Sequence, residues 1–174
     1  MSVVMLSGPV GAGKTTVARE LVAISQAPLC YIEGDTFWPL FAKPGSKSRR
    51  ERFSLLMRSA TAAAVPLARG GYEVLLDFSF PLDFIETARK ILKEIPLDFV
   101  VFRPSLATCE QRAAARPEGN IGDYSAYRDF YTMFDGLPKH EIADDEGDAR
   151  SVARRIRAGL DQGIFRLAAM RNEP

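Results

Sequence analysis

Cysteine and histidine are scarce in this 174-residue sequence. Its two cysteines, Cys30 and Cys109, lie far apart and belong to no Cys-x-x-Cys or Cys/His cluster, and its one histidine is His140. A disulfide framework or a zinc site needs several such residues at short spacing, so neither is expected. The thiols are instead predicted to be small buried side chains in a reducing compartment, and His140 is predicted to be structural.

Long apolar runs and an excess of charge of one sign are also missing. The run Val3–Leu6 is too short for the core of a signal peptide, and no segment is long enough to span a membrane. The formal net charge is +1, so no overall field draws the chain to nucleic acid or to an anionic membrane. We therefore expect a cytoplasmic protein, a monomer or weak homodimer, with no membrane partner and with nucleic acid disfavoured as a partner.

Apolar strand-like runs alternate with segments of helical period along the chain. Strands are predicted at Val3–Leu6, Leu29–Ile32, Glu73–Phe78, Asp98–Phe102 and His140–Ala143. Helices are predicted at Thr16–Ser25, Arg49–Arg69, Pro81–Ile95, from the cap Ser105 to about Arg116, at Tyr124–Phe134, and from Asp148 to about Gln162, with a loose segment at Thr36–Ser48. This alternation predicts an α/β fold with a mainly parallel sheet, and the length predicts a single domain over residues 1–174.

The most specific pattern is GPVGAGKT, which lies between the first strand and the first helix. It fits G-x-x-x-x-G-K-[ST], because Gly8, Gly13, Lys14 and Thr15 occupy the required positions. Glycines let successive backbone N–H groups converge on a phosphate, and the following helix adds its positive N-terminal end. Lys14 can reach the β- and γ-phosphates, and the Thr15 hydroxyl can hold Mg²⁺. The predicted nucleotide-binding residues are Gly8, Gly11, Ala12, Gly13, Lys14, Thr15 and Thr16.

The GPVGAGKT pattern is that of a P-loop, a nucleotide-binding loop shared by several classes of protein. GTPases fit this chain less well because it has no N-K-x-D pattern for guanine, and motor and transport proteins of this kind are longer. From Val3 to about Gln162 the chain resembles the small P-loop kinases, which include shikimate and gluconate kinases, chloramphenicol phosphotransferase, zeta toxins and nucleoside monophosphate kinases. The resemblance implies a three-layer α/β fold whose five-stranded parallel sheet has the order 2-3-1-4-5, with helices on both faces. It also implies ATP and Mg²⁺ as cofactors, an acceptor pocket beyond the second and third strands, and a small helical lid at about residues 116–135.

Asp35 is the predicted catalytic carboxylate. It follows the second strand in IEGDTFWP, and ligands of open α/β sheets bind beyond the carboxyl ends of the strands. Asp35 could accept the proton of an acceptor hydroxyl or hold that hydroxyl in line with the γ-phosphate, and the resemblance places a catalytic aspartate here. The alternative is a turn aspartate after Gly34. Gluconate kinases carry a nearby His-Pro where this chain has Trp38-Pro39, which argues against gluconate as the acceptor.

Asp77 ends the apolar strand VLLD, as in a Walker B motif. It could hold Mg²⁺ or contact the acceptor, or it could only cap the strand end. Four aromatic residues nearby could line the acceptor pocket or pack in the core: Phe37, Trp38, Phe78 and Phe80. Among them, Trp38 is predicted to contact the acceptor.

Arginines follow in TCEQRAAARPEG, where Arg112 and Arg116 are four positions apart and so share one helical face. The resemblance implies that arginines of this helix and of the lid clamp ATP, with Arg112 also catalytic. Arg128 and its neighbouring tyrosines continue a segment that could close over the site. The alternative for all of these arginines is a solvated helix face.

Basic residues also gather after Asp35, at Lys43, Lys47, Arg49, Arg50 and Arg52. Arg49 and Arg52 are predicted to bind a carboxylate or phosphate of the acceptor, together with backbone amides of the helix start. A solvated loop and helix start is the alternative interpretation.

These residues predict an ATP- and Mg²⁺-dependent phosphotransferase that acts on a small molecule. A nucleoside monophosphate kinase, of the cytidylate type, is the nearest alternative, and there Asp35 would orient the acceptor while the basic cluster binds its phosphate. An alternative from another class is a regulatory module that binds nucleotide and hydrolyses it slowly. A polynucleotide 5′-kinase would need a broadly basic groove, which the near-neutral charge does not favour.

Overall fold

Five parallel strands form the centre of the computed structural model, which describes residues 1–117, 119–143 and 147–168. The strands are β1 (Val3–Ser7), β2 (Leu29–Glu33), β3 (Glu73–Asp77), β4 (Leu97–Phe102) and β5 (Glu141–Ile142). Their order is β2-β3-β1-β4-β5, and each neighbouring pair is parallel. The predicted fold class and strand order are therefore confirmed.

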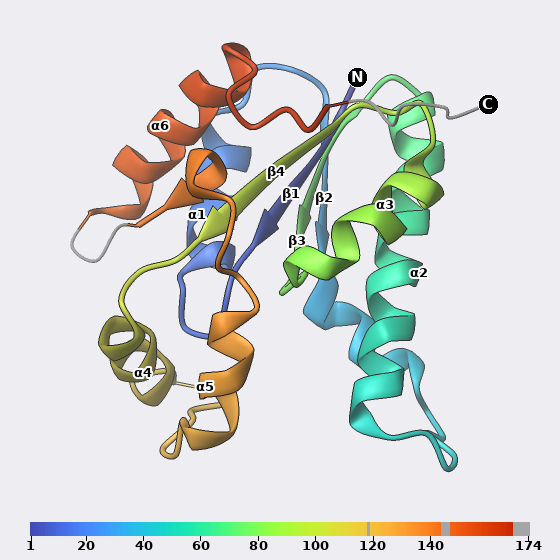
Figure 1. Ribbon diagram of the computed structural model, residues 1–174. Helices are drawn as coiled ribbons and strands as arrows, with labels where there is room; N and C mark the ends of the chain where they lie inside the picture. The colour runs from blue at the N-terminus through green and yellow to red at the C-terminus, as the bar shows by residue number, and fades with distance from the viewer. Residues whose placement is uncertain (118, 144–146, 169–174) are drawn as a thin grey trace.

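Helices cover both faces of this sheet (Figure 1). The α-helices are α1 (Lys14–Ile24), α2 (Arg49–Arg69), α3 (Ile85–Leu92), α4 (Leu106–Ala114), α5 (Ser125–Thr132) and α6 (Ala149–Asp161), and the 3₁₀ helices are η1 (Gly34–Leu40), η2 (Leu82–Phe84) and η3 (Pro138–His140). Residues of β1 alternate between the two cores: Val3 and Met5 pack on the α2/α3 side, whereas Val4 and Leu6 pack on the α1/α6 side. Because helices cover both faces of the sheet, both faces of β1 are buried, and β1 is apolar at consecutive positions.

Several predicted boundaries are wrong, for local reasons. The segment expected to be loose begins with η1, which contains Pro39. The helix expected from Pro81 is shorter, because Pro81 precedes η2 and α3 ends before Lys93, whose φ is 57°. His140 lies in η3, just before β5, and its Nδ1 lies 2.8 Å from the carbonyl oxygen of Phe99, which agrees with a structural role.

The outer edge of β4 is covered by two separate segments. Strand β5 pairs only with Val101 and Phe102, and residues after α6 return to the other half of β4, where Arg166 forms an antiparallel bridge with Asp98. The Arg166 guanidinium binds the buried Asp98 carboxylate through two hydrogen bonds, of 2.7 and 2.9 Å. Sequence reasoning did not foresee this return of the chain.

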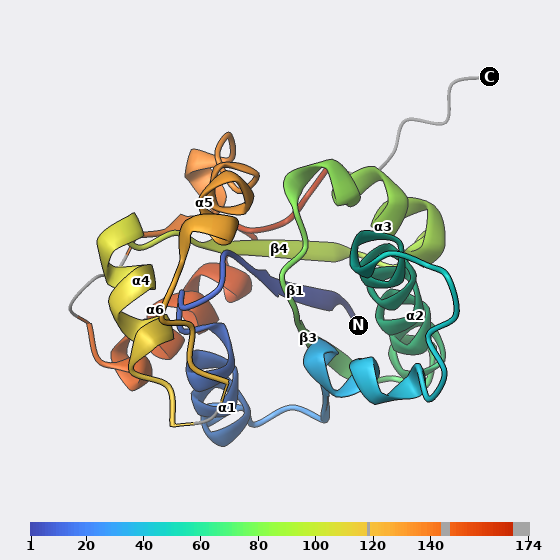
Figure 2. The ribbon, with the colours of Figure 1, turned by 90° about the horizontal axis from the view of Figure 1, so that it is seen from below.

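The carboxyl ends of the strands position the candidate site. The GPVGAGKT loop follows β1, η1 follows β2, and Asp77 ends β3. Seen from below in Figure 2, α4 and α5 lie on one side of these strand ends, and η1 with the start of α2 lies on the other. Within the described residues, no helix is both long and apolar enough to cross a membrane.

Candidate active site

The loop between β1 and α1 packs closely against α4. Gly11 has a φ of 82°, and a Cβ built on it would lie 2.2 Å from the carbonyl oxygen of Cys109, so only glycine fits there. Gly13 is the N-cap of α1, and no side chain caps the amides of this helix start. Ala12 is buried beneath the loop and Thr16 is exposed on the first turn of α1. The loop thus presents the first-turn amides of α1, which suits a bound phosphate.

Lys14 lies across this loop. Its Nζ donates hydrogen bonds to the carbonyl oxygens of Gly8 (3.0 Å) and Pro9 (2.9 Å). Burial lowers the pKa of the Lys14 ammonium, while the carboxylates of Asp77 and Asp35 favour its charged form. The structure therefore brings the loop lysine into the field of both predicted aspartates.

Thr15 and Asp77 meet at the ends of two neighbouring strands. The Thr15 hydroxyl donates to Asp77 Oδ2 at 2.6 Å, and the Tyr31 hydroxyl, from β2, donates to the same oxygen at 3.3 Å. Asp77 is 2% exposed, and burial raises the pKa of its carboxyl group although the Lys14 ammonium and the two hydroxyls oppose that shift. Sequence reasoning missed Tyr31, because one tyrosine in a strand carries no distinguishing signal.

These oxygens fit the magnesium ion that the resemblance implies. Among the described residues, no group of three or more His, Cys, Asp or Glu side chains could hold a metal by itself. Mg²⁺ that binds together with a nucleotide needs fewer protein ligands, because it keeps several waters and is also bound by the phosphates. One or two protein oxygens complete such a site. A threonine hydroxyl and a buried carboxylate in mutual contact supply those oxygens.

The acceptor side begins directly after β2. Asp35 is exposed in the first turn of η1. A Cβ on the preceding Gly34 would lie 2.4 Å from a ring atom of Phe78, so glycine lets η1 start against the end of β3. Phe78 and Phe80 are buried in the core. Of the two interpretations left open for them, core packing therefore holds and lining of the acceptor pocket does not.

Of the predicted acceptor-binding residues, Asp35 and Trp38 lie on η1 and Arg49 and Arg52 on α2, whereas Asp77 ends β3. The Trp38 ring stacks on Phe53, with ring centroids 6.3 Å apart, and the Arg49 guanidinium lies 4.6 Å from the Trp38 ring centroid. The Arg52 guanidinium lies 5.9 Å from the Phe41 ring centroid. Arg52 Nε is buried, and it has no hydrogen-bond partner within the part of the chain that the structure describes. Arg52 Nε is therefore a buried donor, and anion binding by the Arg52 guanidinium stays a prediction.

A capping box lies at the start of this helix. The Ser48 hydroxyl accepts from the Glu51 amide at 3.2 Å, and the Glu51 carboxylate accepts from the Ser48 amide at 2.8 Å, which is a capping box. These bonds lower the pKa of the Glu51 carboxyl group. The amides of Ser48 and Glu51 are therefore satisfied within the helix start. Anion binding by Arg49, Arg52 and the remaining first-turn amides stays a prediction.

Arg112 and Arg116 do not share a helical face as expected, because α4 ends at Ala114. Arg112 lies beside the phosphate loop, where a Cβ on Gly13 would lie 3.8 Å from its Nη1. Arg116 is exposed beyond the helix, though near enough for its charge to lower the pKa of Lys14. Arg128 forms an ion pair with Glu110 of α4 at 2.7 Å and so ties α5 to α4.

The segment expected to form a lid is mostly exposed, but a few of its side chains anchor it to the rest of the fold. The Tyr124 hydroxyl donates to the carbonyl oxygen of Val10 at 2.6 Å, and Phe134 is fully buried. Phe130 makes an edge-to-face contact with Phe53 of α2, with centroids 6.0 Å apart. Residue 118 lies outside the described residues. Closure of residues 116–135 over the site stays a prediction. The contacts above anchor the part of this segment that begins at Tyr124.

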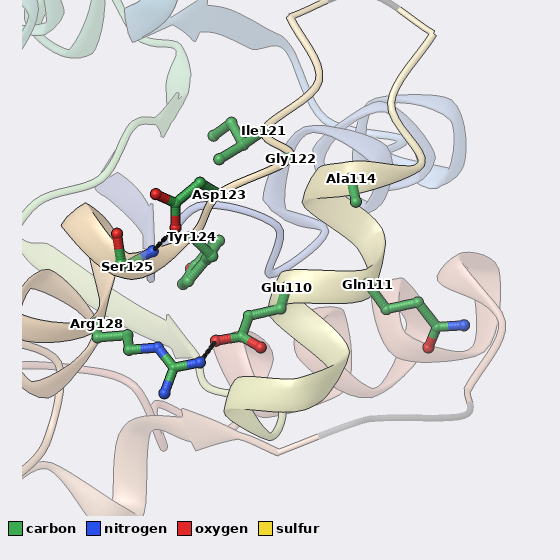
Figure 3. A pocket seen from close by; sticks show the side chains of 9 residues that line it. All are labelled: Glu110, Gln111, Ala114, Ile121, Gly122, Asp123, Tyr124, Ser125 and Arg128. Atoms are coloured by element: carbon green, nitrogen blue, oxygen red, sulfur yellow. Dashed lines mark hydrogen bonds and ion pairs between the residues drawn. The ribbon is translucent and has the colours of Figure 1, made fainter.

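A cavity of about 660 Å³ lies between α4 and the start of α5 (Figure 3). Its lining includes Glu110, Gln111 and Ala114 of α4, whereas Arg112 projects from the opposite side of the same helix. Neither the phosphate loop nor Asp35 lines it. Tyr124, whose hydroxyl contacts the phosphate loop, does line the cavity, so the cavity borders the site on the side of α4 and α5.

Comparisons with known proteins agree with this geometry. The model of a family described as AAA domain matches residues 3–127, more than half of the chain. In a comparison with proteins that have a curated description, none matches this chain.

Solved structures resemble the chain over nearly its full length. A sugar kinase from Janibacter sp. HTCC2649 is 21% identical, with 92% of this chain and 95% of that chain covered and a TM-score of 0.66. The Mycobacterium tuberculosis APS kinase CysC, in complex with AMPPNP and APS, is 22% identical, with 92% and 97% covered and a TM-score of 0.68. Shikimate kinase from Acinetobacter baumannii, in complex with shikimate, is 18% identical, with 94% of each chain covered and a TM-score of 0.62. At these identities the likeness establishes a shared fold.

Proposed function

The chain belongs to the AAA domain family and has the fold of the P-loop kinases, and on that premise we propose that it is an ATP- and Mg²⁺-dependent phosphotransferase. In this proposal it moves the γ-phosphoryl group of ATP to a small-molecule acceptor. One observation carries the proposal: Lys14, Thr15, Asp77 and Asp35 gather at the carboxyl ends of three adjacent strands. A nucleotide-binding module without transfer has no need of Asp35 beside Lys14.

The phosphate half of the site would hold ATP. Amides of the loop and the first turn of α1 donate to the phosphates, and the Lys14 ammonium compensates charge on the β- and γ-phosphates. Thr15 and Asp77 would hold Mg²⁺, which supplies further positive charge against the negative charge that develops during transfer. Arg112 lies beside Gly13 and would neutralise charge on the transferring group.

The acceptor half would position a hydroxyl group. Asp35 is exposed, so it is free to approach a ligand, and it would orient the acceptor hydroxyl or take its proton as the oxygen attacks the γ-phosphorus. The buried Arg52 Nε supports an acceptor that carries a carboxylate or a phosphate, because that donor has no protein partner among the described residues. Trp38 and Arg49 would form a wall beside it.

The experiment is a screen for ADP formation with ATP and Mg²⁺. Sugars, hydroxy acids, antibiotics and nucleoside monophosphates are each added to the wild-type protein and to Lys14→Ala. The proposal expects at least one class to raise ADP formation well above the rate without acceptor, in the wild type only. Stimulation by nucleoside monophosphates alone would identify a nucleoside monophosphate kinase. Slow hydrolysis that no acceptor raises would instead favour a regulatory module.

A further inference from the structure

Three consecutive carbonyl groups of the phosphate loop accept side-chain hydrogen bonds. Those of Gly8 and Pro9 accept from Lys14, whereas that of Val10 accepts from the Tyr124 hydroxyl at 2.6 Å. Lys14 belongs to the loop motif, but Tyr124 lies 114 positions after Val10 in the chain. A distant residue therefore helps to fix the conformation of this loop.

Peptide geometry turns this bond into an orientation of the next amide. In a planar trans peptide the C=O and the N–H of the following residue point in opposite directions. Holding the Val10 carbonyl toward Tyr124 therefore directs the Gly11 N–H the other way. Because the carbonyl of Cys109 closes the space beside the Gly11 Cα, the loop has little room to rotate that peptide back.

We propose that Tyr124 is a positioning residue of the phosphate loop, whose hydroxyl holds the Val10–Gly11 peptide so that the Gly11 N–H faces the nucleotide phosphates. This inference rests on the proposed nucleotide-binding function. It adds to that function a residue outside the loop motif that sets nucleotide affinity.

The surroundings of Tyr124 suit this role. The residue is 5% exposed, lies immediately before α5 beside Asp123 and Ser125 (Figure 3), and packs its ring against Tyr127, with centroids 5.5 Å apart. Its hydroxyl is therefore held in place before any ligand arrives. Burial, with smaller contributions from Cys109 and Glu110, raises the pKa of the Tyr124 hydroxyl, which stays a donor at neutral pH.

The test compares Tyr124→Phe with Tyr131→Phe. Both changes remove only a hydroxyl that donates to a backbone carbonyl, but Tyr131 donates to Pro104, outside the loop, at 2.8 Å. Titration calorimetry with ADP and Mg²⁺ should give a Kd about threefold to tenfold higher for Tyr124→Phe, the usual scale for one hydrogen bond, and an unchanged Kd for Tyr131→Phe. In kinetics, the ATP KM should rise more than kcat falls.

A second measurement separates positioning from folding. In ¹⁵N-labelled protein, ADP with Mg²⁺ should shift the Gly11 amide resonance in the wild type and in Tyr131→Phe, and the shift should be clearly smaller in Tyr124→Phe. Equal ADP affinity and equal Gly11 shifts in the two variants would overturn the inference. Equal loss of affinity in both variants would overturn it too. A wild-type protein that binds no nucleotide would instead refute the proposed function.

Discussion

The two halves of the candidate site are built in different ways. On the phosphate side, one short segment supplies almost everything: its own carbonyls hold Lys14, and Thr15 bonds to Asp77. On the acceptor side, the side chains come from η1 and α2, and they contact one another through rings and guanidinium groups, as Trp38 and Arg49 do. Backbone geometry therefore determines the first half, and tertiary packing determines the second.

This difference separates phosphate binding, which is general to the fold, from acceptor recognition, which is specific to each protein. A backbone cradle recognises phosphate whatever the acceptor is, so it belongs to the whole fold. In the proposed function, acceptor choice would depend on the shape and charge that Arg52, Phe41 and their neighbours create. Changes to the phosphate loop itself should therefore affect nucleotide affinity, and changes on the acceptor side should leave nucleotide affinity unchanged.

The largest expected effect is at Asp35, where the halves meet. Asp35→Asn should lower the transfer rate by about a hundredfold or more, the usual scale for a positioned acid–base group, and leave the Kd for ADP unchanged. Asp83→Asn is the matched control, because Asp83 is also an exposed acid in the first turn of a 3₁₀ helix. Single-turnover transfer assays check this. Equal rates in the two variants would reduce Asp35 to a turn residue, and a monophosphate acceptor should soften the loss.

A smaller effect is expected at Arg52. Arg52→Gln should raise the acceptor KM about tenfold, equivalent to about 1.4 kcal/mol, and leave the ATP KM nearly unchanged, because its guanidinium faces the acceptor side. Arg50→Gln, on the exposed side of the same helical turn, is the control. Steady-state kinetics with the best acceptor measures both. An uncharged best acceptor, or equal KM values for the two variants, would contradict an anion site here.

An effect of about the same size is expected at Arg112, which lies beside the phosphate loop. Arg112→Ala should lower kcat by about tenfold and change the ADP Kd by less, since ADP lacks the phosphoryl group whose charge the arginine meets in the transition state. Arg58→Ala, an exposed position on α2, provides the control. A larger loss in ADP affinity than in kcat would assign Arg112 to binding alone.

The predictability of each half follows from its construction. The strands, the loop between β1 and α1, and the strand-end positions of Asp35 and Asp77 were predictable from periodicity and a dense local pattern. The strand order was predictable only from the resemblance to the small P-loop kinases. The Ser48–Glu51 capping box was also readable as S-x-x-E and was overlooked. The contacts of Tyr31 and Tyr124 and the return of Arg166 to Asp98 were not predictable, since each joins residues that are distant in sequence and share no local pattern.

Nucleotide-dependent thermal unfolding tests the central claim most directly. At a hundredfold excess of ADP and Mg²⁺ over the Kd, the wild-type protein should gain about 2.7 kcal/mol in its free energy of unfolding. Lys14→Ala should lose most of this gain because it removes the charge that faces the phosphates, whereas Lys47→Ala, an exposed lysine before α2, should keep it. Wild type and Lys14→Ala that melt identically with and without nucleotide would contradict the account.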